Sequence, residues 1–134
     1  MEKVTGETKA VGFEVGARKT FDISLQKAWD FLFSDEGLAL WLGNIAVENL
    51  SKEAEIKSGD VSGTIKVVKP YSHIRMRWKR ADWDNTSTLQ VRVLDAKGKA
   101  TISFHQEQLQ DSKQRDEMKA HWQKVLEKIS AKLS

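Results

Sequence analysis

The feature that most constrains the fold is a strict alternation of apolar and polar residues in several stretches of the chain. Successive side chains of a β-strand point to opposite faces, so each stretch predicts a strand with one wet and one dry face. The first stretch begins at Val11 and runs toward Phe21. The later stretches are Val61–Val67, Ile74–Trp78, Leu89–Val93 and Ala100–Phe104. Together they predict a largely antiparallel sheet that is covered on one side.

The end of the chain supplies a cover for this sheet. Apolar residues recur at helical spacing from Met118 to Leu133, and Asp111 or Ser112 can cap the start of the helix. A helix of roughly 22 residues is about 33 Å long, which is enough to cross a sheet. We therefore expect the dry faces of the strands and this helical stripe to share one interior.

The segment between the first strand and the later ones predicts two short helices. Ser24 is a candidate N-cap for a helix through Phe33, and a second helix is expected from about Asp35 to Leu42. Ala46–Leu50 is a candidate strand, and the polar residues that follow it lead into a Ser-Gly-Asp turn at residues 58–60. The fold class is thus α+β, with a curved antiparallel sheet of about six strands packed on a long C-terminal helix.

Residues 1–10 carry no pattern and are predicted to be a disordered N-terminal end, whereas residues 11–134 are predicted to form a single domain. The absence of cysteine excludes disulfides and thiolate chemistry and fits a reducing compartment. No window approaches the roughly 18 apolar residues of a membrane span. We therefore expect a cytoplasmic monomer without a membrane span. The formal charge of +3 is too small to indicate a nucleic-acid partner.

An ordered set of landmarks resembles a known family. Phe21-Asp22-Ile23-Ser24 leads into Ala28-Trp29 and then Trp41. Gly63, Ile65 and Val67 follow at alternate positions, then Pro70, Ile74 and Trp78. The set ends with Ser87, the strand Thr101–Phe104 and Trp122-x-x-Val125-Leu126. In this order they resemble the START-like (SRPBCC, helix-grip) superfamily, in the branch similar to the C-terminal domain of the heat-shock-protein-90 ATPase activator. His121 departs from the glycine usual before the helical Trp. The superfamily includes cyclases, lipid carriers, hormone receptors and co-chaperone modules, so the fold alone does not give the function.

The resemblance implies an apolar cavity between the sheet and the long helix. Large aromatic and methionine side chains on the inner face suit an apolar small molecule, such as a lipid or an aromatic metabolite. Alternatively, the same side chains fill the space. The expected ligand-binding walls are Trp41, Ile65, Val67, Met76, Trp78, Trp83, Val91, Phe104, Met118 and Trp122.

Catalytic residues are not recognisable in the sequence. The three histidines lack the spacing of a zinc site, the carboxylates lie on wet segments, and no nucleophile elbow or phosphate loop occurs. We expect no catalytic residue, no metal and no cofactor, and a cyclase-type enzyme is the weakest of the alternatives. Gln106 falls on the same strand face as Phe104, so it would need a hydrogen-bond partner if it pointed inward. A glutamine at the sheet edge in water is the simpler interpretation.

A stripe of cations is the sharpest charge feature of the sequence. Arg75, Arg77 and Lys79 share one strand face, with Trp83 nearby as a candidate exposed anchor. One interpretation is a docking surface for an acidic protein partner, and the simpler one is a solvated face that is balanced by Glu48, Glu53 or Glu107. The leading hypothesis is therefore a non-enzymatic domain that binds a hydrophobic small molecule. The alternative is a co-chaperone-like interaction module.

Overall fold

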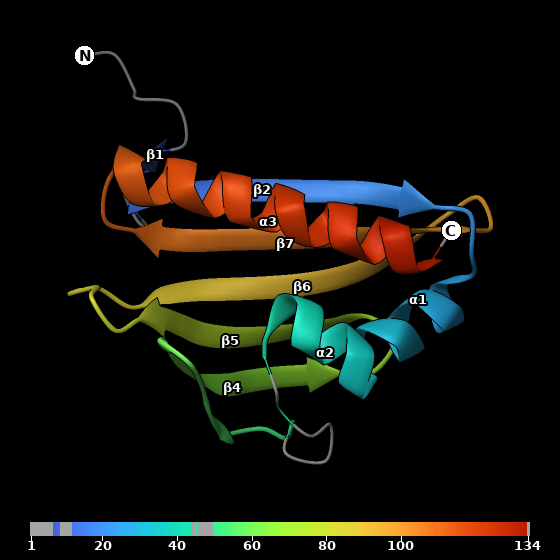
Figure 1. Ribbon diagram of the computed structural model, residues 1–134, viewed down its shortest axis with the longest axis horizontal. Helices are drawn as coiled ribbons and strands as arrows, with labels where there is room; N and C mark the ends of the chain where they lie inside the picture. The colour runs from blue at the N-terminus through green and yellow to red at the C-terminus, as the bar shows by residue number, and fades with distance from the viewer. Residues whose placement is uncertain (1–6, 9–11, 44, 46–49, 134) are drawn as a thin grey trace.

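The strands form one antiparallel sheet in the order β1-β2-β7-β6-β5-β4-β3 (Figure 1). The computed structural model describes residues 7–8, 12–43, 45 and 50–133. The strands are β1 (Glu7–Thr8), β2 (Gly12–Phe21), β3 (Glu55–Ser58), β4 (Val61–Lys69), β5 (His73–Arg80), β6 (Ser87–Ala96) and β7 (Lys99–Leu109). The predicted α+β helix-grip fold is confirmed.

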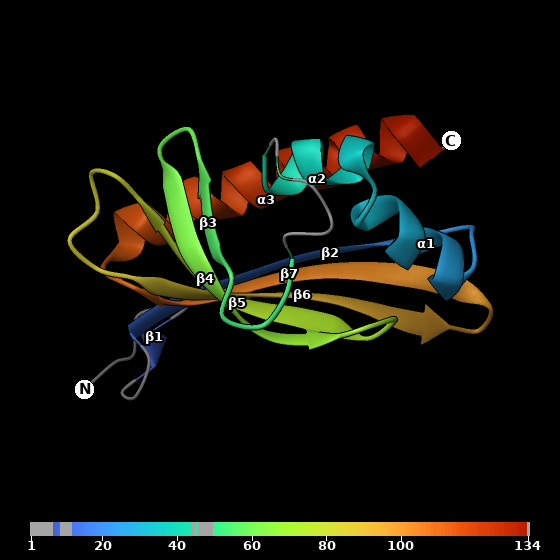
Figure 2. The same cartoon turned by 90° about the horizontal axis from the view of Figure 1, so that it is seen from below.

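The helices of the described part of the chain lie on one side of the sheet, and the sheet curls toward them at β4 and β3 (Figure 2). They are α1 (Leu25–Leu32), α2 (Asp35–Trp41) and α3 (Ser112–Leu133). Each begins with a side-chain cap, because Ser24, Ser34 and Asp111 accept hydrogen bonds from the backbone N–H three residues later, at 3.2, 3.1 and 2.8 Å. Helix α3 runs along β2 and β7, while α2 lies over the other half of the sheet (Figure 1).

The core lies between these helices and the inner face of the sheet. Met118, Trp122 and Ile129 of α3 are fully buried, so the predicted stripe does face the dry sides of the strands. Burial of such a stripe along 22 residues holds the helix in place far more strongly than helix propensity does.

The two edge strands of the sheet, β1 and β3, differ from the sequence prediction. Strand β3 is formed by Glu55–Ser58, in a segment whose sequence predicts a polar loop. The sequence shows no strand pattern there because Ile56 is the only buried residue of the strand. The candidate strand Ala46–Leu50 lies almost wholly outside the described residues. Glu7–Thr8 pair with Gly12–Phe13 inside the segment expected to be disordered, whereas residues 1–6 and 9–10 are not described.

Candidate functional site

Most of the side chains expected to line a ligand cavity lie between the inner face of the sheet and the helices. Nine of the ten side chains are at most 6% exposed, namely Trp41, Ile65, Met76, Trp78, Trp83, Val91, Phe104, Met118 and Trp122. Their rings contact one another. Trp122 stacks on Phe104 with a centroid distance of 4.7 Å and an interplanar angle of 7°, and it lies 6.1 Å from Trp78. These aromatic rings therefore pack against each other as a core.

Val67 does not belong to this wall. It is 39% exposed and pairs with Arg75, because the register of β4 and β5 shifts between Ile65 and Val67. Such a β-bulge inserts one extra residue into a strand, which sends the following side chain to the opposite face. The prediction that Val67 faces inward with Ile65 is wrong.

Trp83 is likewise not an exposed anchor. It is 6% exposed and packs edge-on against Trp78 with ring centroids 5.4 Å apart. The backbone N–H of Trp83 donates to the carbonyl of Arg80 in a tight turn directly after β5. Arg80 itself lies over the Trp78 ring, with 5.6 Å from its guanidinium carbon to the ring centroid.

Gln106 points into this core and is fully buried, so the interpretation of an edge residue in water is wrong. Its amide oxygen accepts from the Trp122 indole N–H, and its amide nitrogen donates to the Ser87 hydroxyl, both at 2.8 Å. The Ser87 hydroxyl in turn donates to the backbone carbonyl of Trp78 at 2.6 Å. The protein itself thus satisfies these buried polar groups, and no ligand is needed to do so.

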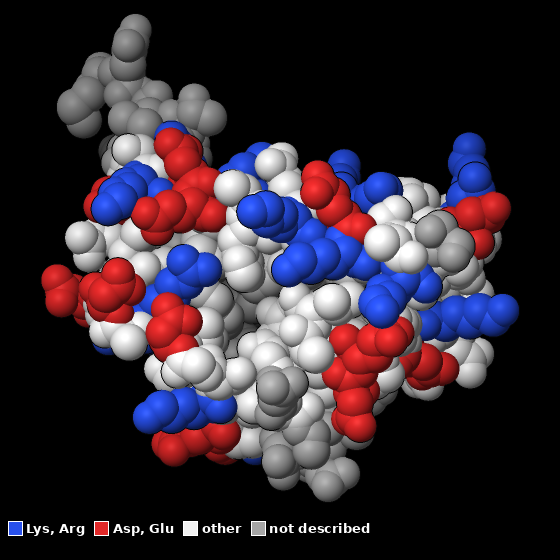
Figure 3. Space-filling view, in the orientation of Figure 1, with Lys and Arg blue, Asp and Glu red and all other residues white. Residues whose placement is uncertain are grey.

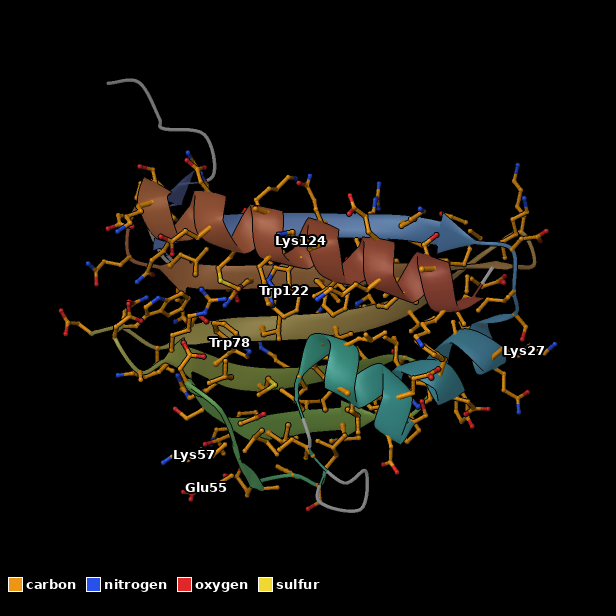
Figure 4. The ribbon with its side chains drawn as sticks, in the orientation of Figure 1. Lys27, Glu55, Lys57, Trp78, Trp122 and Lys124 are labelled. Atoms are coloured by element: carbon orange, nitrogen blue, oxygen red, sulfur yellow. The ribbon has the colours of Figure 1, made fainter. Side chains whose placement is uncertain are left out.

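A hollow remains where α2, β4 and α3 meet, and we call it the mouth hollow. It measures about 160 Å³ and is lined chiefly by Trp41, Trp78, Val61 and His121. Figure 3 shows the surface hollowed beside α2, and Figure 4 places Trp78 at this position below α3. The hollow is smaller than the roughly 300–1,000 Å³ of most ligand pockets.

His121 forms the polar side of the mouth hollow. Burial first, and then the positive charges of Arg80 and Lys128, lower the pKa of His121 to about 4, although Asp60 opposes the shift. Its ring lies 4.6 Å from that of Trp122, edge to face. The imidazole is therefore neutral near pH 7, and the hollow is uncharged there.

The outer face of the sheet carries the predicted cationic stripe. Arg75, Arg77 and Lys79 all point to this side, as the alternation in β5 predicts. Arg75 forms an ion pair with Glu107 of β7, with 3.1 Å between its Nη2 and Oε1 of the carboxylate. Glu53 pairs with Lys66 at the same distance. The interpretation of a balanced, solvated face is thus confirmed for Arg75.

Arg77 and Lys79 line a larger hollow of about 570 Å³ on this face. Lys57 of β3 joins them, and Glu55 is the one acidic side chain among the described residues that line the hollow. We call this feature the cationic hollow. Figure 4 shows Lys57 and Glu55 projecting from β3 away from the helices. Lys57 was missed in the sequence because its segment was interpreted as a loop, and only the isolated Ile56 indicates a strand there.

The floor of the cationic hollow is formed by short residues of β4. A Cβ atom at Gly63 would lie 1.9 Å from the carbonyl oxygen of Arg77, so this position requires glycine. Ser62 and Thr64 flank it and face outward. Long side chains on β3 and β5 stand on either side of these short ones, which produces the concave shape.

Metal binding and membrane insertion are two further possibilities for the described part of the chain. No group of three or more His, Asp or Glu side chains there is arranged to hold a metal ion. His105 lies on the outer face, 3.8 Å from Glu14, while His121 lies on the inner side. None of the described helices is long and apolar enough to cross a membrane.

Comparisons with known proteins agree with the fold. Residues 22–134 match the family model described as Activator of Hsp90 ATPase homolog 1-like protein. Among curated proteins, no sequence matches the chain significantly.

Three solved structures illustrate the likeness. CalU16 from Micromonospora echinospora has a TM-score of 0.76 at 13% identity, over 92% of this chain and 78% of its own. DynU16, from the dynemicin biosynthetic locus, has a TM-score of 0.71 at 13% identity over 84% of this chain, which spans only 44% of DynU16. PFC0360w, an HSP90 activator from Plasmodium falciparum, has a TM-score of 0.62 at 17% identity, over 73% of this chain and 74% of its own. At these identities the likeness concerns the fold alone.

Proposed function

Because the chain belongs to the family of Activator of Hsp90 ATPase homolog 1-like proteins, we propose that it is a non-catalytic interaction module. It docks an acidic segment of a partner protein in the cationic hollow. Hsp90 is the candidate partner, since the family is named for it and a structural neighbour is described as an HSP90 activator.

The observation that carries this proposal is the contrast between paired and unpaired cations on the outer face. Arg75 is neutralised by Glu107, whereas Lys57, Arg77 and Lys79 form no ion pair with any described carboxylate. Unpaired cations around a concave surface attract an acidic partner and set its orientation. Each exposed pair contributes only up to about 1 kcal/mol, so we expect modest affinity that weakens with salt.

The test measures the affinity for Hsp90 and the stimulation of the Hsp90 ATPase. It compares the parent chain with a double charge-reversal variant, Arg77→Glu with Lys79→Glu. We expect a loss of about tenfold in affinity, because two attractive contacts become repulsive. Lys27→Glu with Lys124→Glu is the matched control. It makes the same charge change on α1 and α3, where Figure 4 shows both lysines far from Lys57. Equal affinity for both variants and the parent chain would refute the outer-face site.

An acidic peptide serves as a second probe in the same assay. Binding of a Glu-rich peptide, lost on charge reversal, without binding of Hsp90 would retain the docking surface and exclude Hsp90 as the partner. If neither Hsp90 nor the peptide bound the parent chain at low salt, the proposed function would be wrong.

A small apolar ligand is the second candidate function, and the mouth hollow is the observation that favours it. Its 160 Å³ would hold a single ring between Trp41 and Trp78, not a lipid. Binding should change tryptophan fluorescence and shift the amide resonances around Val61. Ala39 also lines this hollow, so Ala39→Trp should fill it and abolish both signals. An aromatic ligand that bound Ala39→Trp equally well would exclude this site.

A further inference from the structure

We propose that the cationic hollow recognises a phosphoryl group, carried on a phosphorylated serine or threonine of the docked segment. This inference rests on the proposed docking of an acidic segment, and it names the chemistry that the segment presents. Three observations support it: the register of the strands, the unpaired donors, and the local charge.

The register gathers the polar groups of the hollow into two adjacent rows. Lys57, Ser62 and Lys79 pair across β3, β4 and β5 in one row. Thr64 lies between Glu55 and Arg77 in the next row. Directly opposed side chains in a sheet lie roughly 5 Å apart, so a single group seated over Ser62 and Thr64 is within reach of all three cations.

The hydroxyl groups of this hollow differ from others on the same sheet. Elsewhere on the outer face, Thr20 bonds to Thr101 at 2.7 Å, and Thr88 donates to Gln108. By contrast, no described residue forms a side-chain hydrogen bond with any of the three lining hydroxyls, which are Ser62, Thr64 and Thr86. The hollow thus combines hydroxyl donors that lack protein partners with cations that lack carboxylate partners. An anion with several oxygen atoms can accept hydrogen bonds from both kinds of group.

The local charge favours a dianion over a carboxylate. Three cations and Glu55 give the lining a net charge of +2, from three positive charges and one negative charge. A phosphoserine carries about −1.5 to −2 at neutral pH and presents three acceptor oxygens, whereas a carboxylate carries −1 and presents two. The guanidinium of Arg77 can also donate two parallel N–H bonds to a phosphoryl group, which an ammonium cannot do.

The shape and the lining favour a polypeptide as the carrier of this group. The hollow holds about 570 Å³, which is room for a modified side chain and its neighbours. It lies beside β3, the last strand of the sheet, whose described residues pair with β4 alone. Among the described residues that line it there is no aromatic side chain, and these residues therefore offer no stacking surface of the kind on which single-stranded nucleic acids depend.

The experiment measures fluorescence anisotropy of a labelled short peptide that carries two flanking glutamates and one central position. That position is phosphoserine, glutamate or serine in three otherwise identical peptides. We expect the phosphoserine peptide to bind about tenfold more tightly than the glutamate peptide, and inorganic phosphate to compete with it.

Two variants test whether the preference for phosphoserine arises in the cationic hollow. Both substituted positions are exposed, so we expect neither variant to disturb the fold. Arg77→Lys keeps the charge and loses the forked donor, so it should reduce the preference for phosphoserine over glutamate to near unity. Glu55→Gln removes the opposing charge and should tighten phosphopeptide binding about threefold. Lys124→Glu is the control on α3, for which we expect less than a twofold change.

The outcomes separate this inference from the proposed function. Equal binding of the phosphoserine and glutamate peptides would overturn the phosphoryl inference and leave acidic docking intact. No binding of any peptide would overturn both. If single-stranded DNA bound as tightly as the phosphopeptide and was lost in Arg77→Lys, the carrier would be a nucleic acid and the inference would also be wrong.

Discussion

The two faces of β5 differ in how completely the protein itself satisfies their side chains. On the inner face, Met76 and Trp78 are at most 1% exposed and contact other core residues. On the outer face, Arg77 and Lys79 form no ion pair with any described residue. The inward side chains of β5 therefore pack in the core, whereas Arg77 and Lys79 on its outer face remain available for binding. We therefore expect substitutions on the inner face to change stability and substitutions on the outer face to change the proposed recognition.

Hydrogen-bonding groups on the two faces of the sheet also differ in whether they have partners within the chain. Gln106, buried against α3, has both ends of its amide bonded within the chain. Ser62 and Thr64, outside, have no such side-chain partner among the described residues. Because the amide of Gln106 already has its partners within the chain, it offers a ligand little to bind, which favours the outer face as the candidate site.

The largest expected effect tests the inner face at α3. Trp122→Ala should lower the free energy of unfolding by about 3–5 kcal/mol, because a fully buried ring leaves a cavity. It also removes the stack on Phe104 and the hydrogen bond to Gln106. Urea unfolding followed by circular dichroism measures the change. A loss of less than about 1 kcal/mol would mean that the helix does not depend on this contact.

A smaller loss is expected when the buried amide is replaced. Gln106→Leu should cost about 1–3 kcal/mol, since the Trp122 indole N–H would remain buried without an acceptor. Trp122→Phe removes that N–H and most of the penalty with it, so the two changes together should cost less than the sum of the single ones. Additive losses in the double-mutant cycle would show that the hydrogen bond contributes nothing to stability.

The fold was predictable because it depends on periodicity. Alternation in β5, β6 and β7 and the stripe of α3 each place apolar residues on one side, and Trp122 is buried as that pattern requires. Ser24 and Asp111 were identifiable as caps because their side chains suit the first unpaired N–H groups of a helix.

The remaining features depend on tertiary context that periodicity does not contain. Val67 is apolar, but a β-bulge turns its side chain outward. The alternation of apolar and polar residues does not reveal this bulge. Gln106 is polar by type, and its burial becomes favourable only because Trp122 and Ser87 meet it from two other elements. Lys57 lies in the cationic hollow because it belongs to β3. This strand has four residues, of which one is buried, so it is too short to produce a recognisable alternation.

A third prediction concerns the boundary between the two regions, at the mouth hollow. The pKa of His121 is about 4 in the folded chain and near 6.5 when unfolded. Between these pH values the unfolded state binds more protons, so the free energy of unfolding falls as the pH decreases from about 6.5 toward 4. The loss should be on the order of 1 kcal/mol, because the half-buried side chain is partly screened by solvent.

Urea unfolding near neutral pH and near pH 5 measures this dependence, and His121→Gln should flatten it. The carboxylates also titrate in this range, so the comparison is the difference between the parent chain and the variant. Identical slopes for both would show that His121 is as accessible to protons in the folded chain as in the unfolded one.

The smallest expected effect on stability belongs to the outer face. Arg77→Glu with Lys79→Glu should change the free energy of unfolding by no more than about 0.5 kcal/mol, because neither side chain forms an ion pair with a described residue. Arg75→Ala should cost slightly more, since it leaves Glu107 without its partner at 3.1 Å. Urea unfolding of both variants beside the parent chain makes the measurement. A loss above about 1 kcal/mol in the double reversal would show that the cations stabilise the fold, and binding defects in that variant could then no longer be assigned to recognition.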